Sequence, residues 1–107
     1  MSSVADDVWK ALADPTRRKL IELLSEQVRT TGELSEMFPS VSRFAVMKHL
    51  DVLEDAGLIS VKREGRLRYN ELQRDPLRTA DEWLARHVEK RRDMLMRLKR
   101  AAEENGE

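Results

Sequence analysis

The side chains best suited to chemistry with a partner lie together in residues 42–55. Val46, Leu50 and Leu53 recur at steps of four and three, which predicts the buried stripe of an amphipathic helix. The rest of this segment offers hydroxyl, cationic and apolar side chains: Ser42, Arg43, Phe44, Met47 and Lys48. Cations and hydroxyls hydrogen-bond to phosphates and base edges, whereas apolar groups contact thymine methyl groups. The combination favours a helix that binds double-stranded DNA in the major groove.

A second group of cations lies in "KREGRLR", residues 62–68. Its basic members are Lys62, Arg63, Arg66 and Arg68. The glycine within this stretch is typical of a hairpin turn, and a basic hairpin tip favours contact with the DNA backbone or the minor groove.

Thr16, Arg17 and Arg18 form a third candidate group at the start of a predicted helix. Backbone N–H groups at such a helix start attract phosphate, so these residues are candidate phosphate contacts. A solvated helix face explains the two arginines about equally well.

The residue types and their spacing give little support for metal binding or catalysis. The chain has no cysteine, so disulfides, thiolate metal sites and thiol redox switches are excluded. Its histidines, His49 and His87, have no neighbours at metal-ligand spacing, so we expect no metal site and no cofactor within one chain. A metal site whose ligands come from both chains of a dimer is left open by the sequence. Because no Gly-rich phosphate loop or Ser/His/Asp arrangement is evident, an enzyme is the least favoured class.

Composition sets the bounds on size and partners. The 107 residues suffice for one domain, and 40% hydrophobic with 5% aromatic residues favours a helical protein with a modest aliphatic core. The 20 basic and 20 acidic residues cancel, so a polyanion would be bound by local basic clusters. No apolar run is long enough to cross a membrane and no signal-peptide pattern opens the chain, so we expect a cytoplasmic protein without a membrane partner.

The pattern predicts four short helices, a β-hairpin and a long last helix. The helices are expected at residues 4–13, after Asp14-Pro15, after a Thr30/Glu33 capping box, and at residues 42–55 and 76–100. Alternation with a period of two on both sides of Gly65 predicts the hairpin at residues 58–72. We expect one domain of residues 1–102 that includes the last helix, followed by a frayed tail at 103–107.

The last helix carries the pattern of a helix-pair seam. Steps of three and four connect Leu77, Ala80, Leu84, Val88, Arg91, Leu95 and Leu98. A helix of about 25 residues is about 38 Å long, which is more than so small a body can cover. The seam therefore favours a homodimer interface, in which Trp9 and Trp83 would also fit. The alternative is a helix that lies along its own domain.

The predicted order of elements is that of a winged helix-turn-helix, mainly α-helical with a β-hairpin wing. The segments "LADPTRRKLIELL", "GELSEMF", "VSRFAVMKHLDVLEDAGLI" and "VKREGRLRYNEL" together resemble the ArsR/SmtB family of bacterial winged-helix repressors, in particular its short, metal-free members. The resemblance extends from about Val8 to Leu72 and continues more loosely through the last helix.

The resemblance implies a recognition helix at residues 42–55 and a wing at residues 58–72. It implies a repressor that binds a palindromic operator, including its own promoter, as a homodimer joined by the first and last helices. The expected dimer contacts are Val8, Trp9, Leu77, Trp83, Leu84, Val88, Leu95 and Leu98.

A winged-helix module that binds protein rather than DNA is the main alternative. The zero net charge and the apolar pair Phe44 and Met47 motivate it, because an exposed apolar pair often marks a protein-binding surface. A DNA-binding assay at low salt separates the two functions. The operator sequence, the regulated genes, any effector, and repression versus activation all stay open.

Overall fold

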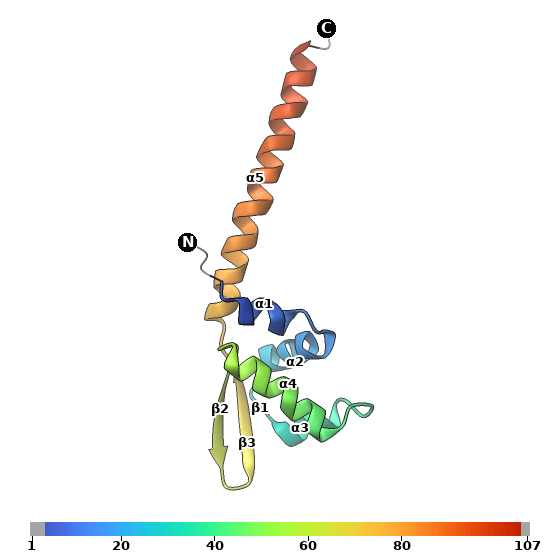
Figure 1. Ribbon diagram of the computed structural model, residues 1–107, viewed down its shortest axis with the longest axis vertical. Coiled ribbons are helices and arrows are strands. Elements are labelled where there is room, and N and C mark those ends of the chain that lie inside the picture. Colours follow the sequence, from blue (N-terminus) through green and yellow to red (C-terminus); the bar gives the residue numbers. More distant parts are fainter. Residues whose placement is uncertain (1–3, 106–107) are drawn as a thin grey trace.

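The computed structural model describes residues 4–105, with the side chains of residues 90 and 91 excepted. Within these residues the chain folds into five helices and a small antiparallel sheet. The helices are α1 (Asp6–Leu12), α2 (Pro15–Glu26), α3 (Thr31–Glu36), α4 (Arg43–Asp55) and α5 (Asp75–Asn105). The strands are β1 (Arg29–Thr30), β2 (Ile59–Glu64) and β3 (Leu67–Leu72) (Figure 1). The predicted fold class, mainly α-helical with a β-hairpin, is confirmed.

Helices α2, α3 and α4 begin where a side chain accepts an unpaired N–H group of the first turn. Asp14 caps α2, and Pro15 follows at the first helical position. Thr30 Oγ1 accepts from the Glu33 backbone N–H at 3.1 Å, while Glu33 Oε1 accepts from the Thr30 N–H at 2.9 Å. Ser42 caps α4 in the same way. Each such cap stabilises a helix by about 1 kcal/mol, and the sequence predicted the helix starts at Asp14-Pro15 and at the Thr30/Glu33 capping box.

Two glycines form the turns on either side of β2. Gly57 follows α4 with a φ of +74°, the left-handed conformation that commonly ends a helix. In the hairpin, Glu64 lies opposite Leu67, so Gly65 and Arg66 form a two-residue turn. Gly65 has a φ of +60° and Arg66 does not have a positive φ, which matches a type II′ turn and the right-handed twist of the strands.

Strand β1 was not predicted. Arg29 and Thr30 pair with Asn70 and Tyr69, so the sheet order is β1-β3-β2. The buried Asn70 side chain supports the pairing, because its Nδ2 donates to Arg29 O at 3.2 Å and Thr31 Oγ1 at 3.1 Å. Two residues are too few to show the alternation by which a strand is recognised.

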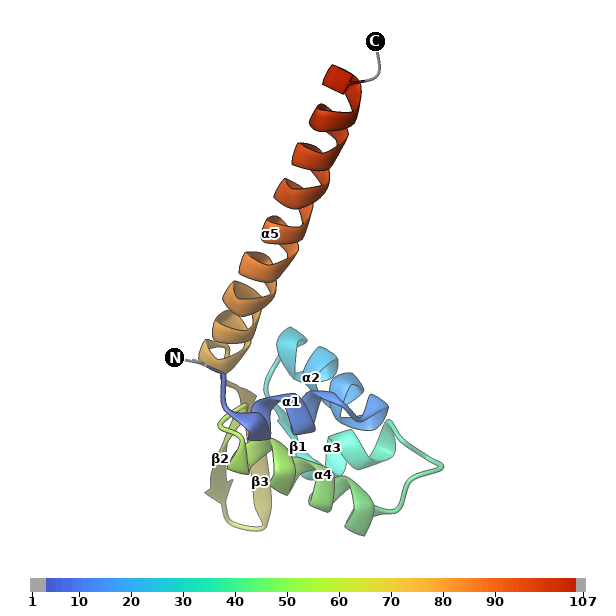
Figure 2. The same ribbon diagram turned by 45° about the horizontal axis from the view of Figure 1, so that its top comes forward.

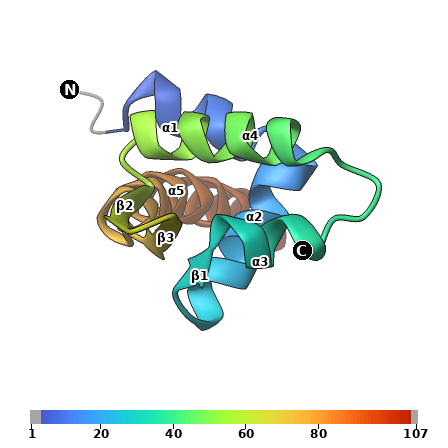
Figure 3. The same ribbon diagram turned by 90° about the horizontal axis from the view of Figure 1, so that it is seen from below.

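The core lies between helices α1–α4 and one face of the sheet. The apolar stripe of α4, Val46, Leu50 and Leu53, is fully buried there, as predicted. Because one side of α4 is committed to this core, the other side faces outward. Seen from below, α3, α4 and the hairpin lie on the side of the molecule opposite the far end of α5 (Figures 1 and 3).

Helix α5 projects beyond the body, and the molecule is 73 Å long in its largest dimension (Figures 1 and 2). The helix ends at Asn105, so residues 103–105, which we expected to be frayed, continue it. Residues 1–3, 106 and 107 of the predicted domain and tail lie outside the described residues. Within residues 4–105, no helix combines the length and the hydropathy that crossing a bilayer requires.

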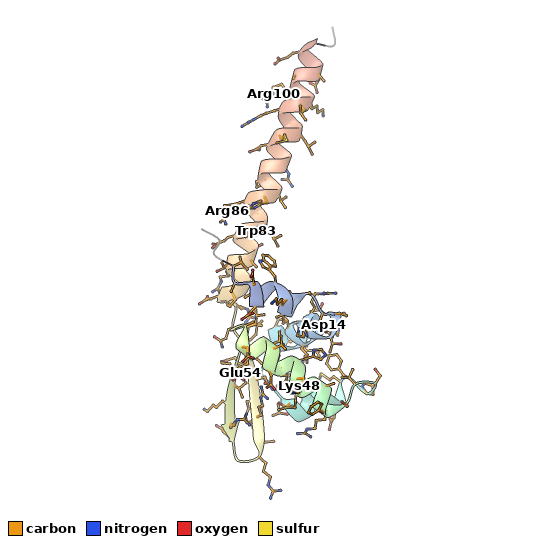
Figure 4. The ribbon with its side chains drawn as sticks, in the orientation of Figure 1. Asp14, Lys48, Glu54, Trp83, Arg86 and Arg100 are labelled. Carbon is orange, nitrogen blue, oxygen red and sulfur yellow. The ribbon has the colours of Figure 1, made fainter. Side chains whose placement is uncertain are left out.

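The predicted dimer contacts divide into two groups. Val8 and Ala80 are buried in the core of the single chain, and Leu77 packs against that core. Val8 is therefore already covered within the single chain, and its predicted contact with a partner stays a prediction. By contrast, Leu84, Val88, Leu95 and Leu98 are exposed. Trp9 and Trp83 meet edge to face with ring centroids 5.5 Å apart, at the junction of α1 and α5 (Figure 4).

Candidate nucleic-acid interface

A groove of about 600 Å³ separates the start of α3, the start of α4 and the hairpin. Its lining includes Arg43, Arg63, Arg66 and Arg68. Phe44 and Met47 of α4 add an apolar wall. The fold thus brings together the two segments that the sequence singled out, residues 42–48 and the hairpin. A cationic groove beside an exposed helix is suited to the phosphates and base edges of DNA.

The first turns of α4 present their functional side chains to solvent. Phe44 is 72% exposed, an unusual position for a large apolar ring. Lys48 lies one turn later, with its Nζ 5.2 Å from the Phe44 ring centroid (Figure 4). Arg43, the first residue of the helix, is also exposed. This arrangement places two cations and an aromatic ring on the part of α4 that a major groove would accept.

The hairpin cations do not all face the groove. Arg63 and Arg66 line it, and neither forms an ion pair or hydrogen bond through its side chain with another described residue. Lys62 lies on the other face of the hairpin beside Tyr69, and its Nζ is 3.4 Å from Glu64 Oε1. The strand alternation separates neighbouring residues in this way, so only Arg63 and Arg66 share the groove with α4 as free cations.

Arg68 departs from the prediction of a solvent-exposed wing cation. Its side chain is only 6% exposed and points from β3 toward α4. One guanidinium nitrogen, Nη1, lies 3.5 Å from Met47 Sδ and 3.3 Å from Asp51 Oδ1. Met47 is accordingly half-buried under the hairpin rather than freely exposed. Because this side chain is buried against α4, it presents little of its charge to the groove, and its predicted contact with DNA is disfavoured in this arrangement.

Arg17 and Arg18 also have roles that the sequence did not indicate. Arg17 donates from Nη2 to Lys10 O at 2.8 Å and from Nε to Ala11 O at 2.9 Å. Arg18 Nη1 donates to Leu12 O at 2.8 Å. These carbonyls belong to the last turn of α1, where a helix runs out of its own N–H donors, although Lys10 O also accepts from the Ala13 N–H at 3.2 Å. The two arginines therefore cap α1, and a phosphate contact of Arg17, Arg18 and the half-buried Thr16 stays a prediction.

Arg17 also connects to the recognition-helix candidate. Its Nη1 lies 3.2 Å from His49 Nδ1 of α4, and Asp14 Oδ2 lies 3.9 Å from the same ring nitrogen. Burial raises the pKa of Asp14, but the hydrogen bond from Arg17 N and the charges of His49 and Arg17 outweigh it. The pKa of Asp14 consequently lies below its usual value near 3.8.

Replacing Asp14 by asparagine keeps a capping oxygen and removes the charge. We expect the free energy of unfolding to fall by about 0.5 kcal/mol near pH 7, from the lost interaction with the helix start and the neighbouring cations. A carboxylate with a lowered pKa stabilises the fold above its unfolded pKa and loses that effect as the pH falls. The difference from wild type should therefore vanish near pH 2, measured by urea unfolding followed by circular dichroism. Glu71→Gln, which removes an equal charge from exposed β3, is the control. A difference that persists at low pH would show that the charge of Asp14 is not responsible.

Sequence reasoning missed three residues at or behind the groove. Asp51 and Glu54 of α4 form ion pairs with Arg68, and Thr31 lines the groove while accepting from Asn70. The two carboxylates lie one turn apart on α4, and a basic residue in a following strand is the signal that suggests such a pairing. The pairing itself depends on where β3 crosses α4, which the local pattern does not encode.

His87 has a local environment in α5. Its ring stacks on Trp83 with centroids 4.2 Å apart, and its Nδ1 lies 2.9 Å from Trp83 O. Within residues 4–105, no three metal-ligating side chains of the His, Cys, Asp and Glu types come together.

Comparison with known proteins agrees with this geometry. A family model described as a helix-turn-helix domain matches residues 12–62. The transcriptional repressor SdpR of Bacillus subtilis (strain 168) is 34% identical over 85 residues, which cover 79% of this chain and 93% of SdpR.

Solved structures give the same result. The crystal structure of an ArsR family transcriptional regulator is 36% identical and superposes with a TM-score of 0.74, covering 78% of this chain and 86% of the other. An ArsR-like transcriptional regulator from Rhodococcus sp. RHA1 is 28% identical with a TM-score of 0.79, covering 92% of this chain and 89% of that protein.

Proposed function

Since the chain belongs to the ArsR family of helix-turn-helix transcriptional regulators, whose members are not enzymes, we propose that it is a homodimeric repressor of a palindromic operator. In this proposal α4 enters the major groove and the hairpin contacts the flanking backbone or minor groove. The operator includes the promoter of the protein's own gene.

The observation that carries the proposal is the shared groove. Arg43 from α4 and Arg63 and Arg66 from the hairpin line one cationic surface, although 20 or more residues separate the two segments. Phosphate contacts from the hairpin would position α4, and the side chains of α4 would distinguish base pairs. Ser42, Phe44, Met47 and Lys48 complete the proposed recognition surface, with Lys62 available to phosphate on the outer face of the hairpin.

The exposed face of α5 supports the homodimer. Leu84, Val88, Leu95 and Leu98 form an apolar stripe that the single chain leaves in water. A second copy of the helix would bury this stripe by packing its own against it, with Trp9 and Trp83 at the edge. Two-fold symmetry would set two copies of α4 about 34 Å apart, which suits successive major grooves on one side of DNA.

The direct test is binding to the DNA upstream of the protein's own gene, compared with a scrambled duplex by fluorescence anisotropy. Arg63 and Arg66 from each of two protomers would give about four phosphate contacts, so affinity should fall roughly a hundredfold between about 50 and 200 mM salt. Arg66→Ala should weaken binding to both duplexes alike and lower the slope of log K against log salt by about one for each protomer.

Equal binding of the upstream and scrambled duplexes would place the operator elsewhere. If the protein bound neither duplex at low salt, the proposal of a repressor would be rejected and a protein-binding module would be favoured. The exposed Phe44 ring is the observation that supports this second function, because it would be a suitable anchor for an apolar partner.

A further inference from the structure

A buried arginine joins the hairpin to the recognition helix. Arg68 lies on β3, two residues after the hairpin turn, and its side chain is 6% exposed. Nη1 is 3.3 Å from Asp51 Oδ1, and Nη2 is 3.6 Å from Glu54 Oε1. Figure 4 shows Glu54 at the end of α4 that lies beside the hairpin. One planar cation thus contacts two successive turns of α4 at once.

The cost of this arrangement argues that it has a purpose. A buried guanidinium is stabilised only when its donors are used, yet Nε and Nη2 of Arg68 have no hydrogen-bond partner among the described residues. An apolar side chain beside Met47 would fill the same space without that cost. Stability of the body is therefore a weak explanation for the presence of an arginine at this position.

The position of Arg68 suggests what the ion pair does. The residue directly opposite Arg68 on β2 is Arg63, and Arg66 is two residues away at the turn. Both of these line the groove as free cations. The two-stranded tip has few other contacts to hold it, since Leu67 is exposed and Gly65 has open space around it. The direction in which the tip cations point thus depends on how β3 is fixed to α4.

We propose that Arg68 is a positioning residue, which clamps the hairpin to α4 through Asp51 and Glu54 and thereby sets the wing cations at the spacing that DNA requires. This inference deepens the proposed function and rests on it for the DNA contacts. The clamp orders the wing before binding, so DNA does not have to supply the free energy of ordering. Arg68 itself does not touch DNA.

Two variants separate a clamp from a simple effect of charge. Arg68→Met removes the cation, adds no buried polar group, and changes the net charge of the three clamp residues from −1 to −2. The triple variant Arg68→Met, Asp51→Asn, Glu54→Gln removes every charge of the clamp and brings the net charge to zero. Arg78→Met is the control, because it removes an arginine that is ion-paired with Asp75 on exposed α5.

A clamp predicts that both variants behave alike, although they change the charge in opposite directions. We expect each to bind the operator about tenfold more weakly than wild type and to lower the salt slope as Arg66→Ala does. In DNA-free protein, the NMR order parameters of the hairpin-tip amides should fall relative to those of α4 in both variants. Thermal unfolding of the variants checks that the body remains folded.

Three results would overturn the proposal. Recovery of wild-type affinity by the triple variant would show that Arg68 only offsets the charges of Asp51 and Glu54. Unchanged order parameters at the hairpin tip would show that Arg68 does not hold it. Additive losses when Arg68→Met is combined with Arg66→Ala would assign Arg68 an independent DNA contact. The order parameters are measured without DNA, so a wild-type protein that fails to bind DNA would refute the proposed function and leave the clamp to be judged on its own.

Discussion

Replacing Arg43 by alanine should abolish specific operator binding and leave the fold intact. Arg43 is the exposed first residue of α4 and lines the groove, where its guanidinium would reach a base edge or an adjacent phosphate. A base contact of this kind contributes about 2 kcal/mol, and a homodimer makes it twice, so the operator affinity should fall roughly a thousandfold. Affinity for scrambled DNA should fall far less. Fluorescence anisotropy with both duplexes measures the two changes.

Lys48→Ala should act in the same direction, because Lys48 is exposed on α4 one turn after Phe44, with its Nζ 5.2 Å from the Phe44 ring centroid. Lys19→Ala, which removes an equal charge from exposed α2, is the matched control and should bind the operator as wild type does. Thermal unfolding of the Arg43 and Lys48 variants should stay close to that of wild type, since both side chains are exposed. Operator binding retained by both variants would reject α4 as the recognition helix.

Replacing Leu95 by aspartate should dissociate the dimer. Leu95 lies on the apolar stripe of α5 and is 56% exposed in the single chain. A carboxylate buried there without a partner costs about 3 kcal/mol or more, so the dimer dissociation constant should rise by more than a hundredfold. Operator binding should be lost with it, because one copy of α4 contacts only half of the palindrome. Analytical ultracentrifugation and the anisotropy assay follow the two losses.

The neighbouring residue provides the matched control for this variant. Met96 is also an exposed apolar side chain, but it lies about 100° around the helix from Leu95 and off the stripe. Met96→Asp introduces the same charge one residue away and should leave the dimer unchanged. If both variants dissociated equally, the stripe would not be the interface. If neither did, the dimer would have to form through another surface.

Local chemistry made much of this fold predictable. The capping box at Thr30 and Glu33 and the helix start at Asp14-Pro15 depend on residues within a few positions of one another. The hairpin and the buried stripe of α4 follow from periods of two and 3.6. Arg43, Arg63 and Arg66 were assigned to one surface because this order of elements places the hairpin beside α4.

The contacts that sequence did not predict share a physical cause. Sequence pattern shows that an arginine is charged, but not which carbonyl or carboxylate the fold brings within reach of it. Arg17, Arg18 and Arg68 were all candidate DNA contacts, and each is also bound to groups of its own chain on another element. Strand β1 escaped prediction for a related reason, because it is stabilised by Asn70, 40 residues further along the chain. Long side chains with several donors, such as arginine, can most readily bind acceptors that are distant in the sequence, so their contacts are the hardest to predict.

The three bonds of Arg17 have a consequence for how the protein responds to its partners. Arg17 belongs to α2, yet the same rigid guanidinium bonds to the end of α1 and to His49 on α4. If α1 shifts when two chains assemble, the contact between Arg17 and His49 on α4 must change as well. The free energy of dimerisation would then be coupled to the free energy of DNA binding. Thermodynamic linkage requires that such a coupling act equally in both directions. DNA would then raise the affinity of dimerisation by the same factor by which dimerisation raises the affinity for DNA. A molecule that disturbed α1 would lower both affinities.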